Sequence, residues 1–121
     1  MINVVLVHPE IAPNTGNVIR LCANTGAHLH LVEPLGFELD APRLRRAGLD
    51  YHEFATIRVH ADWPAFLERE RPRRRFALTT RAQCRPTDAA FERGDYLVFG
   101  CETRGLPDAI LDEFAPSQRL R

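Results

Sequence analysis

The stretch that decides the fold is INVVLVHPEIAPNTGNVIRLCANTG, which spans residues 2–26. The run Ile2–Val7 is mostly apolar and rich in β-branched residues, the pattern of a strand buried on both faces. A helix should follow, because Asn14 is a good N-cap and Gly26 is a typical helix stop. Between them, four residues recur at helical spacing on one face: Val18, Leu21, Cys22 and Thr25. The stretch therefore predicts one strand–helix unit.

The rest of the chain continues this alternation. Four more short apolar runs predict strands, at residues 28–32, 56–59, 76–79 and 96–99. Asp62 can cap a second helix with Pro64 in its first turn, and Pro107 opens a third. The arginine-rich residues 42–47 form a single turn that ends at Gly48. Strands that alternate with helices predict the α/β class: a mostly parallel sheet flanked by helices, with right-handed crossovers.

The composition limits what the chain can be. Its 121 residues suffice for one domain, 1–121, and its 16 basic and 16 acidic residues cancel, so net charge does not indicate nucleic-acid binding. The three cysteines are odd in number and far apart, which predicts neither disulfides nor a metal site. The sequence begins without a basic leader, and none of its apolar runs approaches the length of roughly 20 residues that is needed to span a bilayer. We therefore expect a cytoplasmic protein with no membrane partner.

The last residues, Arg119 to Arg121, resemble the beginning of a further strand. A parallel α/β sheet rarely closes on half a strand. We therefore expect the natural chain to continue past Arg121.

The connection after the first strand argues against two common nucleotide sites. Residues 8–17, HPEIAPNTGN, contain two prolines where a dinucleotide-binding Rossmann domain needs Gly-x-Gly-x-x-Gly. No Gly-Lys-Ser/Thr of a P-loop occurs in the chain. Ordinary NAD and ATP binding are therefore disfavoured.

The polar face of the predicted first helix suggests an anion site. Asn17, Arg20 and Asn24 lie together opposite the apolar face, near a helix amino terminus that itself attracts anions. A phosphate of an RNA backbone would fit this group. The alternative is that Arg20 is a solvated surface residue, which the residues alone favour.

The stretch YLVFGCETRGLP, residues 96–107, forms a second candidate site. A buried strand ends at Gly100, and a short polar loop leads into the helix opened by proline. Ligands of open parallel sheets bind beyond the carboxyl ends of the strands, so Glu102 and Arg104 would face a ligand that approaches Gly100. The alternative is a simple turn with positive φ at Gly100 and Gly105, and a surface pair of Glu102 with Arg104. The two interpretations are equally supported.

Two arginine clusters could contact a nucleic-acid backbone. Arg43 and Arg46 lie on the same face of one turn. Arg73 to Arg75 precede a strand beside Pro72, and we interpret this second cluster as solvated. The five histidines have no mutual spacing that indicates ligation or a catalytic pair, and we treat them as structural.

These motifs together resemble a known family. PNTGNVIRLCANTG at residues 13–26 is similar to motif one of the SpoU branch of the SPOUT methyltransferases, and FGCETRGLP at residues 99–107 is similar to motif two. RLRRAGLDYH at residues 43–52 resembles the small single-domain members. Those members transfer a methyl group from S-adenosylmethionine to the ribose 2′-OH of the wobble pyrimidine, cytidine or carboxymethylaminomethyluridine, of leucine tRNAs.

The resemblance carries further implications. It implies a homodimer, a tRNA substrate, and a carboxyl-terminal trefoil knot, whose Ser-x-Asn-x-Ser-Asn-like motif is absent from this sequence. It implies that Leu78 and Gly100 hold S-adenosylmethionine, and that S-adenosylhomocysteine is the product. Asn14, Arg20 and Glu102 become the catalytic residues, with Glu102 orienting the arginine, while Arg43 and Arg46 bind RNA.

Arg20 has the central role in the mechanism that we infer. A guanidinium with a pKa above about 12 is a poor proton acceptor. We therefore expect Arg20 to bind the neighbouring phosphate and stabilise the developing alkoxide. The rival functions are a non-catalytic RNA-binding module derived from this fold and, more distantly, a nucleotide-binding regulatory α/β domain.

Overall fold

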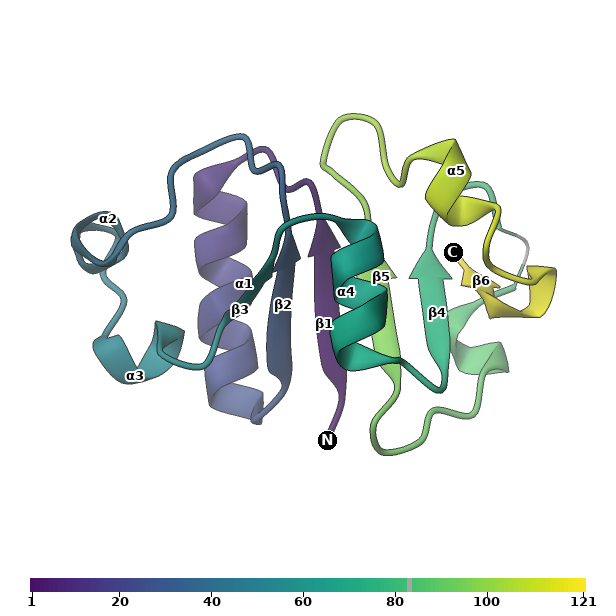
Figure 1. Cartoon of the computed structure of the whole chain (residues 1–121). Coiled ribbons are helices and arrows are strands. Elements are labelled where there is room, and N and C mark those ends of the chain that lie inside the picture. Colours follow the sequence, from purple (N-terminus) through teal and green to yellow (C-terminus); the bar gives the residue numbers. More distant parts are fainter. Residues whose placement is uncertain (83) are drawn as a thin grey trace.

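The computed structural model describes residues 1–82 and 84–121, in which helices cover both faces of a six-stranded sheet (Figure 1). The strands are β1 (Asn3–Val7), β2 (His28–Val32), β3 (Arg58–His60), β4 (Arg75–Leu78), β5 (Tyr96–Phe99) and β6 (Arg119–Leu120). The α-helices are α1 (Ala12–Thr25), α2 (Ala41–Arg46), α3 (Tyr51–Phe54), α4 (Trp63–Glu70) and α5 (Asp108–Leu111), and the 3₁₀ helices are η1 (Pro86–Asp88) and η2 (Pro116–Gln118). The predicted α/β class is confirmed.

The strand order is β3-β2-β1-β5-β4-β6, and each neighbouring pair is parallel. The chain builds outward from β1 through β2 to β3, then crosses to the other half of the sheet, so β1 and β5 flank the point where the order reverses. In open α/β sheets, the crevice beyond the carboxyl ends of such strands is the usual ligand site. The loops that follow β1 and β5 therefore border the expected ligand site.

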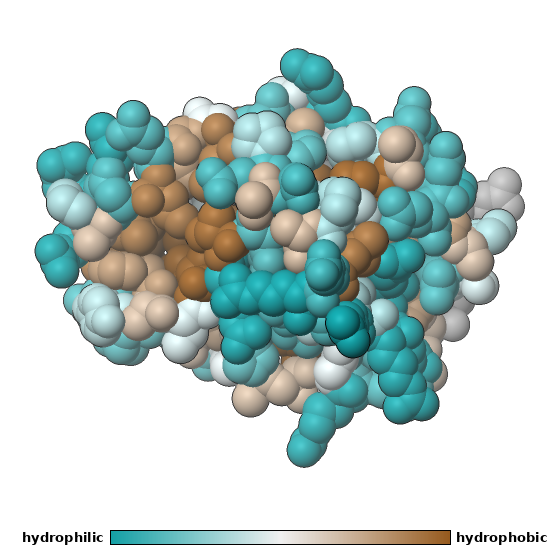
Figure 2. All heavy atoms as spheres, in the orientation of Figure 1, coloured by the Kyte–Doolittle hydropathy of each residue, from teal (hydrophilic) through white to brown (hydrophobic). Residues whose placement is uncertain are grey.

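Alternating strand residues supply two separate cores, one on each face. The face under α4 and α5 buries an aliphatic and aromatic cluster that includes Val5, Val7, Val32, Phe66, Val98 and Phe114. The opposite face packs on α1 and α3 through Leu6, Ile19, Leu29, Leu31, Leu49 and Phe54. This second cluster is incompletely covered, since Figure 2 shows apolar side chains open to solvent between α2 and the sheet.

Helix α1 begins earlier than predicted. Its N-cap is Ile11 rather than Asn14, because Pro13 fits the first turn, where a missing N–H costs nothing. The buried side consists of Thr15, Ile19 and Cys22, so Leu21, which lies ~100° round the helix from Cys22, is 61% exposed. The predicted stop at Gly26 is confirmed, with φ +80° and its N–H donated to Cys22 O.

The other helices follow the predicted capping with small shifts. Asp62 caps α4 by accepting the Ala65 N–H at 2.8 Å, as predicted. Asp40 caps α2, the predicted arginine-rich turn. The four-residue α3 was not predicted. None of the helices among the described residues has the length and apolar character needed to cross a bilayer.

Candidate functional site

Two loops brace each other at the reversal point of the sheet. The Glu102 carboxylate, in the loop after β5, accepts the backbone N–H groups of Glu10, at 3.3 Å, and Ile11. In return, the Glu10 carboxylate accepts the N–H and hydroxyl of Thr103, at 3.1 and 2.6 Å. These bonds from Thr103 lower the pKa of Glu10. The loop after β1 and the loop after β5 are therefore held as one unit at the amino terminus of α1.

Gly100 is required by its own loop. A Cβ at this position would lie 2.0 Å from the Gly105 carbonyl carbon, where the chain folds back after β5. The turn is closed by hydrogen bonds between Cys101 and Gly105 in both directions, with φ +71° at Gly105. The predicted positive φ is thus present at Gly105 but not at Gly100. The returning backbone fills the side of Gly100 where a Cβ would lie, while Gly100 itself still lines a groove.

The two predicted cofactor residues nevertheless share a groove. It has a volume of about 630 Å³ and lies beyond the carboxyl ends of β4 and β5. Its lining combines apolar side chains, of Leu78, Phe99 and Leu106, with hydroxyl groups, of Thr79, Thr80 and Thr103. Glu102 also lines it. The volume falls within the range of small-molecule sites, and the lining also includes the charged residues Arg81, Arg104 and Asp108.

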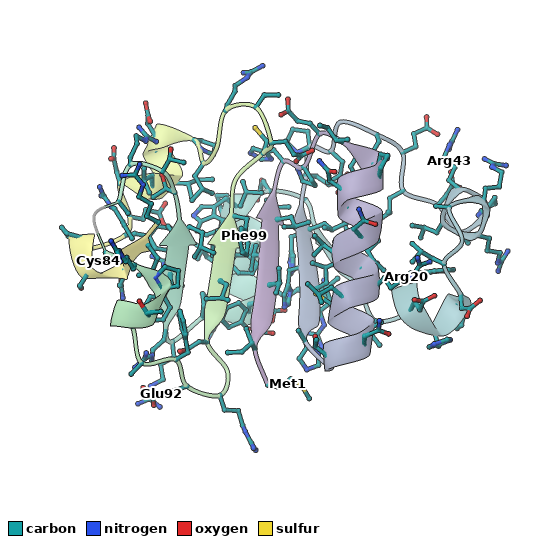
Figure 3. All side chains as sticks on the ribbon, turned by 180° about the vertical axis from the view of Figure 1, so that it is seen from behind. Met1, Arg20, Arg43, Cys84, Glu92 and Phe99 are labelled. Atoms are coloured by element: carbon teal, nitrogen blue, oxygen red, sulfur yellow. The ribbon has the colours of Figure 1, made fainter. Side chains whose placement is uncertain are left out.

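Arg20 lies outside that groove. Its Nε donates to Glu53 Oε2 at 3.3 Å and its Nη2 donates to Gly48 O at 2.7 Å. The predicted contact between Glu102 and Arg20 is absent here, because Glu102 is engaged by the backbone of Glu10 and Ile11. Figure 3 shows Arg20 directed from α1 toward the α2–α3 segment. Asn14, the other predicted catalytic residue, is exposed in the first turns of α1.

Arg20 and Arg43 line a second groove, of about 600 Å³, between α1 and residues 37–49. Arg43 is already paired with Glu38 and Asp40, and the hydrogen bond with Asp40 raises the pKa of Arg43. The pairing arises because Asp40 caps α2 and so lies beside the Arg43 side chain. By contrast, Arg46 is exposed and forms no ion pair within residues 1–82 and 84–121. Of the two predicted RNA-binding arginines, Arg43 therefore has its charge offset by neighbouring carboxylates, and Arg46 has no such pair in the described part of the chain.

The interpretation of Arg73 to Arg75 as a solvated cluster is wrong for two of its members. Arg74 Nε lies 3.0 Å from the buried Asp95 carboxylate, and the side chain also pairs with Glu92. The Arg75 guanidinium stacks 5.2 Å from the centre of the Phe114 ring. Both arginines therefore make contacts within the fold, Arg74 with the turn before β5 and Arg75 with the aromatic core.

His30, His60 and Glu70 form a buried polar group that the sequence does not predict. His30 Nδ1 lies 3.1 Å from His60 Nε2, so two histidines without any suggestive spacing are direct neighbours. Glu70, 3.8 Å from His30, accepts from Tyr96 and Arg58, each at 3.0 Å. His30, His60 and Glu70 together have the donor types of a metal site. The Arg58 cation already occupies the Glu70 carboxylate, which disfavours a second cation, and the absence of a metal site stays a prediction.

Burial sets the protonation of this group. It lowers the pKa of His30 to about 4 and also lowers the pKa of His60. Burial and the Glu70 bond raise the pKa of Tyr96 to about 12. At neutral pH the two rings are therefore uncharged, and they lie on β2 and β3, away from both grooves. A structural role for the histidines stays a prediction.

The chain is similar to known proteins in both sequence and structure. A model of the SpoU rRNA Methylase family matches residues 1–119. A protein of Burkholderia pseudomallei (strain 1106a) named tRNA (cytidine(34)-2'-O)-methyltransferase is 67% identical over 123 residues, covering all of this chain and 79% of the relative. A solved structure concerned with 2-OH methylation of C/U34 on tRNA has a TM-score of 0.88 and 46% identity, covering 99% of this chain and 78% of its own.

A more distant structure extends the likeness in fold. The SpoU methyltransferase AviRb from Streptomyces viridochromogenes, solved in complex with the cofactor AdoMet, has a TM-score of 0.74 and 21% identity. The match covers 98% of this chain and 46% of AviRb. At this identity the likeness concerns the fold alone.

Proposed function

Because the chain belongs to the SpoU rRNA methylase family, we propose that it is an S-adenosylmethionine-dependent tRNA 2′-O-methyltransferase acting on the wobble pyrimidine. One observation carries the proposal: the 67% identity with the Burkholderia relative extends over this whole chain. The relative's name specifies cytidine 34, and the C/U34 structure supports a pyrimidine more generally. Leucine tRNAs as the substrate rest on the family resemblance of residues 43–52.

The groove beyond β4 and β5 fits the methyl donor. Leu78 and Leu106 offer apolar walls for a purine, and the threonine hydroxyls offer hydrogen bonds for polar groups. S-adenosylmethionine, when bound, supplies the methyl group that is transferred to the ribose 2′-oxygen, leaving S-adenosylhomocysteine. Leu78 and the backbone at Gly100 are the positions that would hold it. Glu102 keeps this wall in place through the bonds to Glu10 and Ile11.

Arg20 is the residue of this chain that would act on the RNA. Its side chain is 48% exposed and lines the groove beside α1, so it is open to an incoming RNA phosphate or developing alkoxide. Asn14, exposed on the same helix, would contribute a further hydrogen bond. The Arg46 charge is available for backbone phosphates, with Arg43 nearby.

Two further features of the proposal follow from the resemblance, a homodimer and a carboxyl-terminal trefoil knot. We also propose that the protein acts in the cytoplasm, where tRNA is modified. The exposed Leu21 and Met1 side chains support the dimer, since large apolar side chains in one area favour association.

Nucleoside mass spectrometry tests the proposal. Undermodified tRNA is incubated with the full-length protein and S-adenosylmethionine, and a new 2′-O-methylpyrimidine nucleoside is expected. Calorimetry with S-adenosylmethionine distinguishes the rivals: an RNA-binding module would bind tRNA but give no heat with the methyl donor. Binding of neither molecule would favour the regulatory α/β domain and refute the enzyme.

A further inference from the structure

The Arg20 guanidinium is held along one edge only. Of its five N–H donors, the Nε–H is bound by Glu53 and one Nη2–H by the Gly48 carbonyl. No other partner of this side chain occurs within the described residues. Three N–H groups are therefore left for an incoming acceptor, a number sufficient for a bidentate contact with a phosphate or an alkoxide.

Glu53 is well suited to hold an arginine in a fixed direction. Its Oε1 accepts the Asp50 N–H at 2.8 Å in the capping box of α3, while its Oε2 receives Arg20. The Glu53 side chain is only 11% exposed, against 48% for Arg20. One carboxylate oxygen thus anchors Glu53 to the backbone, and the other is presented to the guanidinium.

The backbone around Gly48 and the packing of α3 also keep Glu53 beside Arg20. Gly48 has φ +87°, and a Cβ there would lie 3.5 Å from Arg20 Nη2. Phe54, the neighbour of Glu53, is buried in the core cluster that includes Ile19 of α1. The carboxylate and the guanidinium are therefore carried by two helices that are packed against each other.

We propose that Glu53 is the positioning residue of Arg20, holding the Nε edge so that the other N–H groups face the RNA. This inference rests on the proposed methyltransferase function. It assigns to the segment before and within α3 the orienting role that the family resemblance gives to Glu102. Glu53 itself does not contact the substrate, and it acts through Arg20.

The decisive variant is Glu53→Gln. Its amide oxygen can still accept the Asp50 N–H, but its NH₂ group would then face the Arg20 Nε–H and repel it. We expect the kcat for tRNA methylation to fall about 10- to 100-fold, because a misplaced guanidinium no longer meets the reacting oxygen. The thermal midpoint and the Kd for S-adenosylmethionine should stay unchanged. Asp62→Asn is the matched control, since it makes the same change at the α4 cap and should keep wild-type turnover.

A double-mutant cycle separates positioning from a merely structural effect. If Glu53 acts through Arg20, the variant Glu53→Gln/Arg20→Ala should be no slower than Arg20→Ala alone. Multiplicative losses, or a kcat of Glu53→Gln within twofold of wild type, would overturn the inference. If Glu53→Gln does not fold, Glu53→Asp replaces it in the same double-mutant cycle, because aspartate keeps the charge on a shorter side chain. An inactive wild type that binds no S-adenosylmethionine would instead reject the proposed function.

Discussion

The Glu102 carboxylate accepts the backbone N–H of Ile11, the N-cap of α1, across 91 residues of sequence. An anionic group at this position satisfies an unpaired helix N–H and interacts favourably with the helix dipole. Since Glu10 binds Thr103 in the opposite direction, the loops after β1 and β5 are coupled through two carboxylates. Glu102 thereby joins the wall of one groove to the helix that carries Arg20.

Removing the charge of Glu102 should weaken this connection. For Glu102→Gln we expect the free energy of unfolding to fall by about 1 kcal/mol, as for the loss of a helix N-cap. Urea titration measures the change. Glu68→Gln, at an exposed carboxylate of α4, is the control and should be neutral. Equal midpoints for the two variants would show that the bonds to Glu10 and Ile11 contribute no net stability.

Gly100 should tolerate no side chain. Because a Cβ would meet the Gly105 and Leu106 backbone at 2.0 to 2.1 Å, Gly100→Ala must displace the loop after β5. We expect a loss of more than about 3 kcal/mol, or failure to fold. Gly16→Ala is the control: nothing lies within 4 Å of its Cβ, and alanine favours the helix interior. Circular dichroism melts of both variants check this, and a Gly100→Ala protein that melts like wild type would refute it.

Features set by local chemistry could be predicted from the sequence. The stop of α1 at Gly26 and the Asp62 cap of α4 depend on residues within one turn, and both are present. The strand–helix alternation likewise defines the parallel sheet. The start of α1 differs from the prediction because Pro13 fits its first turn and because Glu102, distant in sequence, accepts the Ile11 N–H.

Features set by tertiary contacts could not be predicted. Nothing in the helical spacing of Leu21 tells which side of α1 faces the sheet, and nothing local links Arg20 with Glu53. His30 and His60 meet because their strands pair in parallel, and His60 fell outside the predicted strand. The motifs indicated the residues of the candidate site, while the partners of its charged side chains required the structure.

Stability should depend on pH through His30. Its pKa in the folded protein, about 4, lies below its ordinary value of 6.5, so the unfolded chain takes up the proton first. The stability is therefore complete above about pH 6.5 and is lost as the pH falls toward 4. Between pH 7.5 and 5 the loss from His30 alone is about 2 kcal/mol.

Urea titrations at the two pH values measure this loss. Burial is the main cause of the shift; of the charges facing His30, Glu70 opposes it, and His60, Arg58 and His28 add to it. His30→Gln should flatten the pH dependence, while the exposed His28→Gln should keep it. A pH dependence that His30→Gln leaves unchanged would assign the effect to other groups.

The two arginines that we propose to bind RNA, Arg43 and Arg46, should contribute unequally to tRNA affinity. Because Arg43 is paired with Glu38 and Asp40, much of its charge is already offset, whereas Arg46 is free to release counterions from a phosphate. Plots of log Kd against log salt for tRNA should lose a slope of about 0.7 to 0.9 in Arg46→Ala and less in Arg43→Ala. Arg93→Ala, at the turn before the amino end of β5, controls for the loss of any surface charge and should leave the slope intact. Equal slope losses for Arg43 and Arg46 would mean that tRNA displaces the Glu38 and Asp40 carboxylates, and that the pairing in the free protein does not persist in the complex.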